Sequence, residues 1–450
     1  MPSLRGRSIP SRISSGTPPA TLARAAAVVS LCFALAGPAL ASDEIHWTLT
    51  GQTSVTFDWR GSNAENTIQL GTTPGTYTRT VTAGTPSPTP DSSPGPFWEA
   101  KLTGLQENTL YYYKIAGGAE HTFRTPPPRG TSDYWFGEEA DIGSTLGWSN
   151  VGITQNMILV DNPNVPGDDR PRFILSPGDL TYGDQETLAD VDQHFNDVMP
   201  WSQDVAYMPA WGNHEWATAG DGKADNLNNY EGRFDFPNSK TSPGATDAVG
   251  NGPGEDWYWF DYGNVRFIAF PEPMSGAWED WVLTVDPVMA AAQSDPAIQF
   301  VVAYGHRPSW SSGADHPGES QMAGYMATLH GKYSKFALTI TGHSHHYERT
   351  DPAQTDGILY IIGPGGGSSL GGITSTQPSW SVYRIDHLEH IRMHVQANRI
   401  DGYTICGPDG SGNADACTQG TVIDSWSIVT GPQGPDVTSP AAVRDLNTGP

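Results

Sequence analysis

Five short segments of the sequence place carboxylate, amide or imidazole side chains directly after apolar runs. The runs lie at residues 134–136, 173–175, 207–211, 301–304 and 338–340, and the segments that follow them are Asp141-Ile142-Gly143, Gly178-Asp179-Leu180-Thr181-Tyr182, Gly212-Asn213-His214-Glu215, Gly305-His306-Arg307-Pro308 and Gly342-His343-Ser344-His345. Together these groups suit hard to borderline divalent or trivalent cations, and no thiolate competes with them. The pattern therefore predicts a metal site.

The elements around these segments indicate how the side chains come together. Apolar strands expected at 172–176, 205–211, 300–304 and 337–341 alternate with helical stretches at 187–199 and 321–336. Such alternation is typical of a layered α/β domain, in which ligand sites form beyond the carboxyl ends of the strands. A lone Asp-x-Gly is usually only a turn, and Gly-Asn-His-Glu could simply begin a helix. Five such segments in one order, each at a strand end, favour a single site.

The sequence before residue 126 has a different character. Short alternating runs at 54–59 and 109–115 are separated by turn signals such as Thr73-Pro74-Gly75, which predicts a small β-sandwich. A proline-rich linker follows at 126–130, and strands return after residue 357.

The order of the five segments resembles the metallophosphoesterase superfamily. Tyr182 in the second segment narrows the resemblance to the purple acid phosphatases. Residues 97–105 are similar to the N-terminal fibronectin-like domain of that family, and Tyr347-Glu348-Arg349 after the last segment also fits. The resemblance covers about residues 45–430. It departs mildly at Ala140, where the family often has glycine, and this leaves Asp141 intact.

The resemblance implies a fold and a set of metal ligands. The expected fold is an N-terminal β-sandwich followed by a catalytic domain with two β-sheets sandwiched and flanked by helices. The implied ligands are Asp141, Tyr182 and His345 for a ferric ion, Asn213, His306 and His343 for a divalent zinc, iron or manganese ion, and Asp179 as a bridge between the two ions.

The implied reaction is hydrolysis of small phosphate monoesters by metal-bound hydroxide. Two cations roughly 3.5–4 Å apart clamp the phosphate and acidify bound water, so hydroxide survives at acidic pH. We expect His214 to contact the phosphate and protonate the leaving alkoxide; otherwise it is a structural histidine. His316 is a candidate second acid, and His346 receives no role. A phosphodiesterase or nucleotide hydrolase with the same metals, and a non-catalytic surface or carbohydrate-binding protein, are the alternatives.

The N-terminal residues and the net charge restrict where the protein can be located and what it can bind. Four arginines and no acid precede the apolar stretch 25–36, and Ala39-Leu40-Ala41 offers small residues for cleavage. This predicts a signal peptide at residues 1–41, with a membrane anchor as the alternative, and hence a secreted or periplasmic protein without a membrane attachment after cleavage. Cleavage would leave 20 basic against 49 acidic residues, a net charge near −29. Such a chain lacks the basic patches that nucleic acid binding needs.

The last predictions concern the two C-terminal cysteines and the domain boundaries. Cys406 and Cys417 read as one disulfide in an oxidising compartment, or as two free thiols. We expect the fibronectin-like domain at 42–128 and the catalytic domain at 129–432. Residues 433–450 resemble a linker and the start of a fibronectin type III module, or are an untidy terminus.

Overall fold

A computed structural model describes residues 42–160, 170–184, 187–216, 227–242, 255–273, 276–410, 415–431 and 434–438. Every described residue belongs to one compact unit, Leu40–Pro450. The predicted signal peptide lies outside the described residues, as do residues 439–450 of the predicted C-terminal linker.

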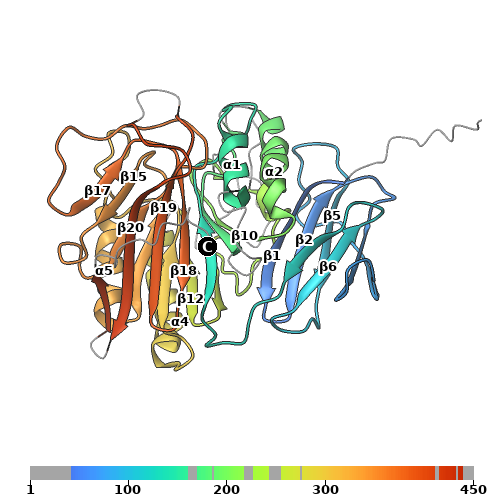
Figure 1. Ribbon diagram of the computed structural model, residues 1–450, viewed down its shortest axis with the longest axis horizontal. Helices are drawn as coiled ribbons and strands as arrows, with labels where there is room; N and C mark the ends of the chain where they lie inside the picture. The colour runs from blue at the N-terminus through green and yellow to red at the C-terminus, as the bar shows by residue number, and fades with distance from the viewer. Residues whose placement is uncertain are drawn as a thin grey trace, which may run out of the picture. The chain divides into compact units, whose positions relative to one another are not determined.

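The N-terminal part is a sandwich of a three-stranded and a four-stranded antiparallel sheet (Figure 1). The first sheet contains β1 (Asp43–Gly51), β2 (Ser54–Arg60) and β5 (Phe97–Leu102), and the second contains β4 (Arg79–Thr82), β3 (Thr67–Gly71), β6 (Leu110–Ile115) and β7 (His121–Arg124). Phe57 of β2 packs against Tyr113 and Phe123 of the opposite sheet, with ring centroids 4.6 and 5.3 Å apart. Alternating aromatic residues on facing strands thus form its core.

The remaining strands form two seven-stranded mixed sheets. In spatial order, the first sheet is β10 (Ala206–Ala210), β9 (Pro171–Pro177), β8 (Tyr134–Glu138), β18 (Glu389–Val395), β19 (Arg399–Cys406), β20 (Val422–Gly431) and β21 (Gly434–Thr438). The second is β11 (Trp259–Tyr262), β12 (Val265–Ala269), β13 (Phe300–Tyr304), β14 (Phe336–Thr341), β16 (Leu359–Ile362), β15 (Tyr347–Thr350) and β17 (Ser381–Ile385).

The two sheets face each other across an aromatic core. Phe136 of β8 and Phe173 of β9 both meet Phe267 of β12, with ring centroids 5.1 and 5.0 Å apart. The helices are α1 (Val151–Val160), α2 (Leu188–Ser202), α3 (Asn228–Glu231), α4 (Ala277–Ser294) and α5 (Ser320–Lys332). Helix α1 packs on β18 of the first sheet and α5 on β14 of the second. The predicted fold class is confirmed.

Strand direction brings the predicted ligand segments to one edge. Strands β8, β9 and β10 run parallel in the first sheet, as do β12, β13, β14 and β16 in the second. Because parallel strands share their carboxyl end, the loops after β8, β9 and β10 lie together, and so do those after β13 and β14.

One helix expectation was wrong at its end. The predicted helix 321–336 ends at Lys332, and Tyr333 leaves the helical conformation (φ −128°, ψ 89°). Phe336 is fully buried and pairs with Val301 as the first residue of β14. The sequence pattern included Phe336 in the helix. Its burial in the sheet explains why the helix ends earlier.

Two further observations concern the cysteines and the helices. Cys406 and Cys417 form the expected disulfide. Within the described ranges, none of the helices combines the length and the apolar character that a membrane crossing requires.

Candidate metal centre

The loops after β8 and β9 run side by side and are joined through their backbones. The amide nitrogen of Asp141 donates to the carbonyl of Gly178 (3.1 Å), that of Ile142 to Asp179 (3.0 Å) and that of Gly143 to Leu180 (2.9 Å). This short ladder fixes the Asp141 loop against the Asp179 loop. Both carboxylates are therefore held by main-chain geometry.

Four of the seven predicted ligands have a left-handed backbone. The φ angles are 55° at Asp141, 50° at Asp179, 74° at Tyr182 and 68° at His343. Residues other than glycine rarely adopt positive φ, and each instance costs on the order of 1–3 kcal/mol. Strain of this kind collects where the surrounding fold must aim a side chain for function.

The first predicted ligand group converges on one point. Tyr182 Oη lies 3.2 Å from Asp141 Oδ1 and 3.1 Å from His345 Nε2, and His345 Nε2 lies 3.1 Å from Asp141 Oδ1. The outer nitrogen of the imidazole, His345 Nδ1, is 2.6 Å from the carbonyl oxygen of Ser369. That contact orients Nε2 toward the phenol and the carboxylate.

The second predicted group converges beside Asp179. His306 Nε2 lies 3.0 Å from Asp179 Oδ2 and 3.1 Å from His343 Nδ1. His306 Nδ1 is 2.9 Å from the carbonyl oxygen of Pro177, so the other ring nitrogen faces the cluster. Burial alone would lower the pKa of His306, but the charges of Asp179 and Asp141 raise it to about 10. The cluster therefore attracts positive charge.

Asn213 is the remaining predicted member of the second group, and the amide nitrogen of its neighbour His214 donates to Asp179 Oδ1 at 3.0 Å. The Oδ1 atom of Asn213 is buried and has no hydrogen-bond partner among the described residues. An unsatisfied buried acceptor normally costs about 1–3 kcal/mol, which a bound cation would offset. Carboxylates, imidazoles, a phenol and this amide form a donor set suited to two metal ions. The residues therefore fit a dinuclear centre.

Two glycines give the ligands the space that they occupy. A Cβ atom on Gly212 would lie 2.2 Å from Asp179 Oδ1, and one on Gly342 would lie 2.2 Å from Asp141 Oδ2. Both distances are far shorter than any van der Waals contact. These positions require glycine because the carboxylates pass directly over the backbone.

His214 stands next to the cluster and is held by an acidic partner. Its Nδ1 lies 2.8 Å from Asp184 Oδ1, and its Nε2 lies 3.7 Å from Asp179 Oδ2. Burial would lower the pKa of His214, but the hydrogen bond with Asp184 and the charges of Asp179, Asp184 and Glu215 raise it to about 9. The imidazole is therefore protonated over the acidic and neutral range.

His316 also reaches the cluster, as the sequence predicted. Its ring stacks on that of His343 with centroids 3.9 Å apart and an interplanar angle of 24°. The side chain is half-buried, and burial is the main cause that lowers its pKa. The structure thus brings all nine predicted site residues into one region.

Two family models match the chain in consecutive regions. The model described as "Purple acid Phosphatase, N-terminal domain" matches residues 42–133, and the one described as "Calcineurin-like phosphoesterase" matches residues 159–347. The chain belongs to the purple acid phosphatase family. The family implies a dinuclear metal centre and hydrolysis of phosphate esters, consistent with the donor set above.

Relatives of this purple acid phosphatase differ in their described activities. The chain is 26% identical to Purple acid phosphatase 22 of Arabidopsis thaliana over 72% of this chain and 71% of the relative. It is 25% identical to Probable inactive purple acid phosphatase 27 of the same plant, over 69% of this chain and only 55% of the relative. It is 28% identical to a nucleotide pyrophosphatase/phosphodiesterase of Hordeum vulgare, over 62% of this chain and 81% of the relative.

A solved structure of the family has the same fold. The purple acid phosphatase PPD1 from yellow lupin (Lupinus luteus) seeds aligns with a TM-score of 0.64 and 18% identity, covering 87% of this chain and 74% of that one.

Sequence reasoning gave no role to several residues that support the cluster. The buried Glu215 carboxylate accepts hydrogen bonds from the amide nitrogens of Asp179, Leu180 and Gly212, each at 2.8 Å. It thereby ties the loop after β9 to the loop after β10. In the sequence, the indication of a role for Glu215 was its position next to His214 in the third segment.

Asp315 performs a similar task on the opposite side. It accepts hydrogen bonds from the amide nitrogen of His345 and from Ser344 Oγ, both at 3.2 Å. No motif marks Asp315, and only the fold brings it to this loop. His346, which received no role, is fully buried with Nε2 3.2 Å from Glu348 Oε2, which indicates a packing role.

Proposed function

We propose that the protein is an exported acid phosphatase that hydrolyses phosphate monoesters at an Fe(III)–divalent metal centre. The observation that carries the proposal is the convergence of two donor groups on the joined loops of Asp141 and Asp179. Asp141, Tyr182 and His345 would hold the ferric ion. Asn213, His306 and His343 would hold zinc, iron or manganese, with Asp179 between the two.

The metal pair, when bound, supplies electrostatic stabilisation of the phosphate and an acidified water molecule as nucleophile. The chain itself supplies the proton. Asp184 fixes the His214 ring through Nδ1 and leaves Nε2 toward the cluster. Because the pKa of His214 is raised to about 9, Nε2–H is available to protonate a leaving alkoxide at acidic pH.

His316 would act as the second acid or phosphate contact. Its lowered pKa means that it gains charge only as the solution becomes acidic. A protonated His316 beside His343 would attract the anionic substrate, which supports activity in the acid range.

Export rests on the N-terminal sequence, which lies outside the described residues, and on the Cys406–Cys417 disulfide. Disulfides persist in oxidising compartments and are rare in the reducing cytosol. Both observations support a secreted or periplasmic location.

Metal content and the visible spectrum of the purified protein test the proposed centre. We expect about two metals per chain, one of them iron, and a charge-transfer band that Tyr182→Phe removes while the far-UV circular dichroism stays unchanged. Fewer than two metals, with no activity in metal-supplemented buffer, would favour the non-catalytic binding protein. A band that survives Tyr182→Phe would remove this phenol from the metal.

The ester class needs a separate test because one relative is a nucleotide pyrophosphatase/phosphodiesterase. Turnover of an aryl phosphate monoester should exceed that of the matched bis-aryl diester. Faster diester turnover would replace the monoesterase with a phosphodiesterase of the same family.

A further inference from the structure

We infer that a cavity at the start of β9 is a second anion site, which binds a small phosphate-bearing molecule. The cavity has a volume of about 280 Å³. One wall comes from the β-sandwich, with Trp47 of β1 and Arg124 of β7, and the other from the catalytic part, with Arg170, Arg172 and Val205. A ligand of this size would therefore contact both parts.

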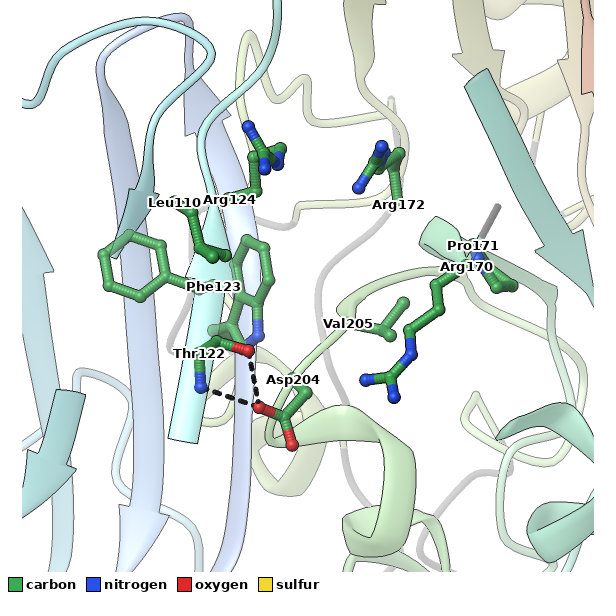
Figure 2. A pocket seen from close by; sticks show the side chains of 10 residues that line it. Leu110, Thr122, Phe123, Arg124, Arg170, Pro171, Arg172, Asp204 and Val205 are labelled. Atoms are coloured by element: carbon green, nitrogen blue, oxygen red, sulfur yellow. Dashed lines mark hydrogen bonds between the residues drawn. The ribbon is translucent and has the colours of Figure 1, made fainter. Parts of the chain in front are cut away.

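The charge of the lining is opposite to that of the chain. The chain has a formal net charge of −25, yet the described part of the lining carries three arginines and one aspartate. Arg124 and Arg172 face each other from opposite walls, and Arg170 reaches in toward Asp204 (Figure 2). The planar guanidinium fork of arginine matches the oxygens of a phosphate.

Two of these arginines retain their hydrogen-bonding capacity. Within the described part of the chain, neither Arg124 nor Arg170 forms an ion pair, and Arg124 Nη1 donates to the carbonyl oxygen of Asn108 (3.1 Å). Most guanidinium N–H groups of both residues are therefore available to a ligand.

A buried donor on the sandwich wall points to the same kind of ligand. Trp47 is 1% exposed, and its Nε1 has no acceptor among the described residues. Indole nitrogen can only donate, and a buried donor without an acceptor costs free energy. An anion with several oxygen acceptors would satisfy Trp47 together with the guanidinium groups.

The single carboxylate of the lining is already engaged on the sandwich side. Asp204 Oδ1 accepts from the amide nitrogen (2.7 Å) and Oγ1 (3.0 Å) of Thr122, and Oδ2 lies 3.1 Å from His121 Nδ1. Figure 2 shows the two contacts with Thr122. Asp204 therefore holds the sandwich to the loop before β10, and its close partners among the described residues are His121 and Thr122 rather than an arginine.

The cavity is separate from the metal centre. Arg170 and Arg172 lie at the beginning of β9, whereas Asp179 follows its end. Seven strand residues at about 3.3 Å each place roughly 20 Å between the two ends. An anion in the cavity cannot be a substrate seated on the metal ligands, and the inference stands whether or not the proposed monoesterase activity is correct.

Equilibrium dialysis of the metal-loaded protein with radiolabelled inorganic phosphate tests the site. The wild type should bind two phosphates per chain, one at the metal centre and one in the cavity. Arg124→Gln/Arg170→Gln should bind one, with kcat, KM and phosphate inhibition of turnover unchanged, which also shows that the variant is folded. Arg79→Gln, which replaces a partly exposed arginine on β4 of the sandwich, is the matched control and should bind two.

A single bound phosphate in the wild type, or two in the double variant, would overturn the inference. If the double variant does not fold, the single variant Arg124→Gln should still weaken the second phosphate roughly tenfold, as expected for a lost charge-assisted hydrogen bond. Unchanged affinity in that variant would also contradict it. Phenylphosphonate in place of phosphate distinguishes the source of the anion: tighter binding indicates an organic phosphate, and weaker binding indicates inorganic phosphate.

Discussion

The two ends of strand β9 carry opposite charge and different kinds of geometry. At its carboxyl end, Asp179 lies among buried ligands whose left-handed backbones and close glycines leave little freedom. At its amino end, Arg170 and Arg172 line a cavity with half-buried and exposed side chains. The proposed cation site therefore lies among buried, fixed side chains, and the inferred anion site among more exposed arginines.

The difference also teaches what a linear sequence reveals. The predicted metal ligands lie in five compact segments, each of which follows the carboxyl end of a strand, so residue types and order were enough to predict them. The cavity takes single residues from β1, β7 and the segments before β9 and β10. No spacing connects Trp47, Arg124 and Arg170 in the sequence, and only the docking of the sandwich brings them together.

The largest expected effect is on catalysis at the carboxyl end of β9, with no change in binding at its amino end. His214→Ala should lower kcat roughly 10²- to 10⁴-fold, because a general acid is lost, while metal content stays at the wild-type value. Phosphate binding in the cavity should not change. His394→Ala, which removes a partly exposed histidine stacked on Trp135, is the matched control for loss of an imidazole.

Full activity in His214→Ala would remove this residue from the reaction. A parallel loss of metal would instead make it a structural support of the centre. Steady-state kinetics with metal analysis of the same preparation distinguish these outcomes.

A smaller effect is expected from Glu215, which joins two ligand loops through three backbone N–H groups. Glu215→Gln keeps one oxygen acceptor but adds an N–H group facing backbone donors. Metal affinity should fall roughly 10- to 100-fold, as for other residues that orient metal ligands. Competition with a chelator measures this change, and an unaltered affinity would show that the loops hold their positions without this carboxylate.

The sequence predicted residues that the structure brings together in one region, but not what orients them. Asp141 and His345 were identifiable because their types and strand-end positions are local properties. Asp315 supports His345 from 30 residues away, and the end of α5 depends on burial of Phe336. Both follow from tertiary packing, which local periodicity does not encode.

Acidic pH should lower the stability of the folded chain through His194, which contacts the first predicted ligand loop. His194 of α2 is fully buried, with Nδ1 2.9 Å from the carbonyl oxygen of Gly143 in the first ligand loop. Burial lowers its pKa to about 3, below the value of about 6.5 in an unfolded chain. As the pH falls below 6.5 the unfolded chain binds a proton that the folded chain excludes, so stability present at pH 8 is lost.

The contribution of His194 at pH 5 is about 2 kcal/mol of unfolding free energy relative to pH 8. Urea unfolding measures the free energy of unfolding at pH 8 and at pH 5. The decrease between these pH values should be smaller by this amount in His194→Gln than in the wild type, because the other buried histidines are the same in both proteins. Identical pH dependence in the two proteins would mean that His194 is protonated in the folded state. The arginines of the cavity remain charged throughout this range.

Salt should produce the smallest effect and sharpen the contrast between the two ends. Raising NaCl from 0.1 to 1 M shortens the screening length from about 10 to about 3 Å, which weakens interactions of exposed guanidinium groups. The dissociation constant of phosphate in the cavity should rise roughly two- to fivefold, as expected for exposed charge pairs. Phosphate inhibition at the buried metal end should change less, because its charges lie away from solvent. Equal salt sensitivity at both ends would mean that the arginines do not provide the binding free energy, and the Trp47 donor would then become the principal contact to test.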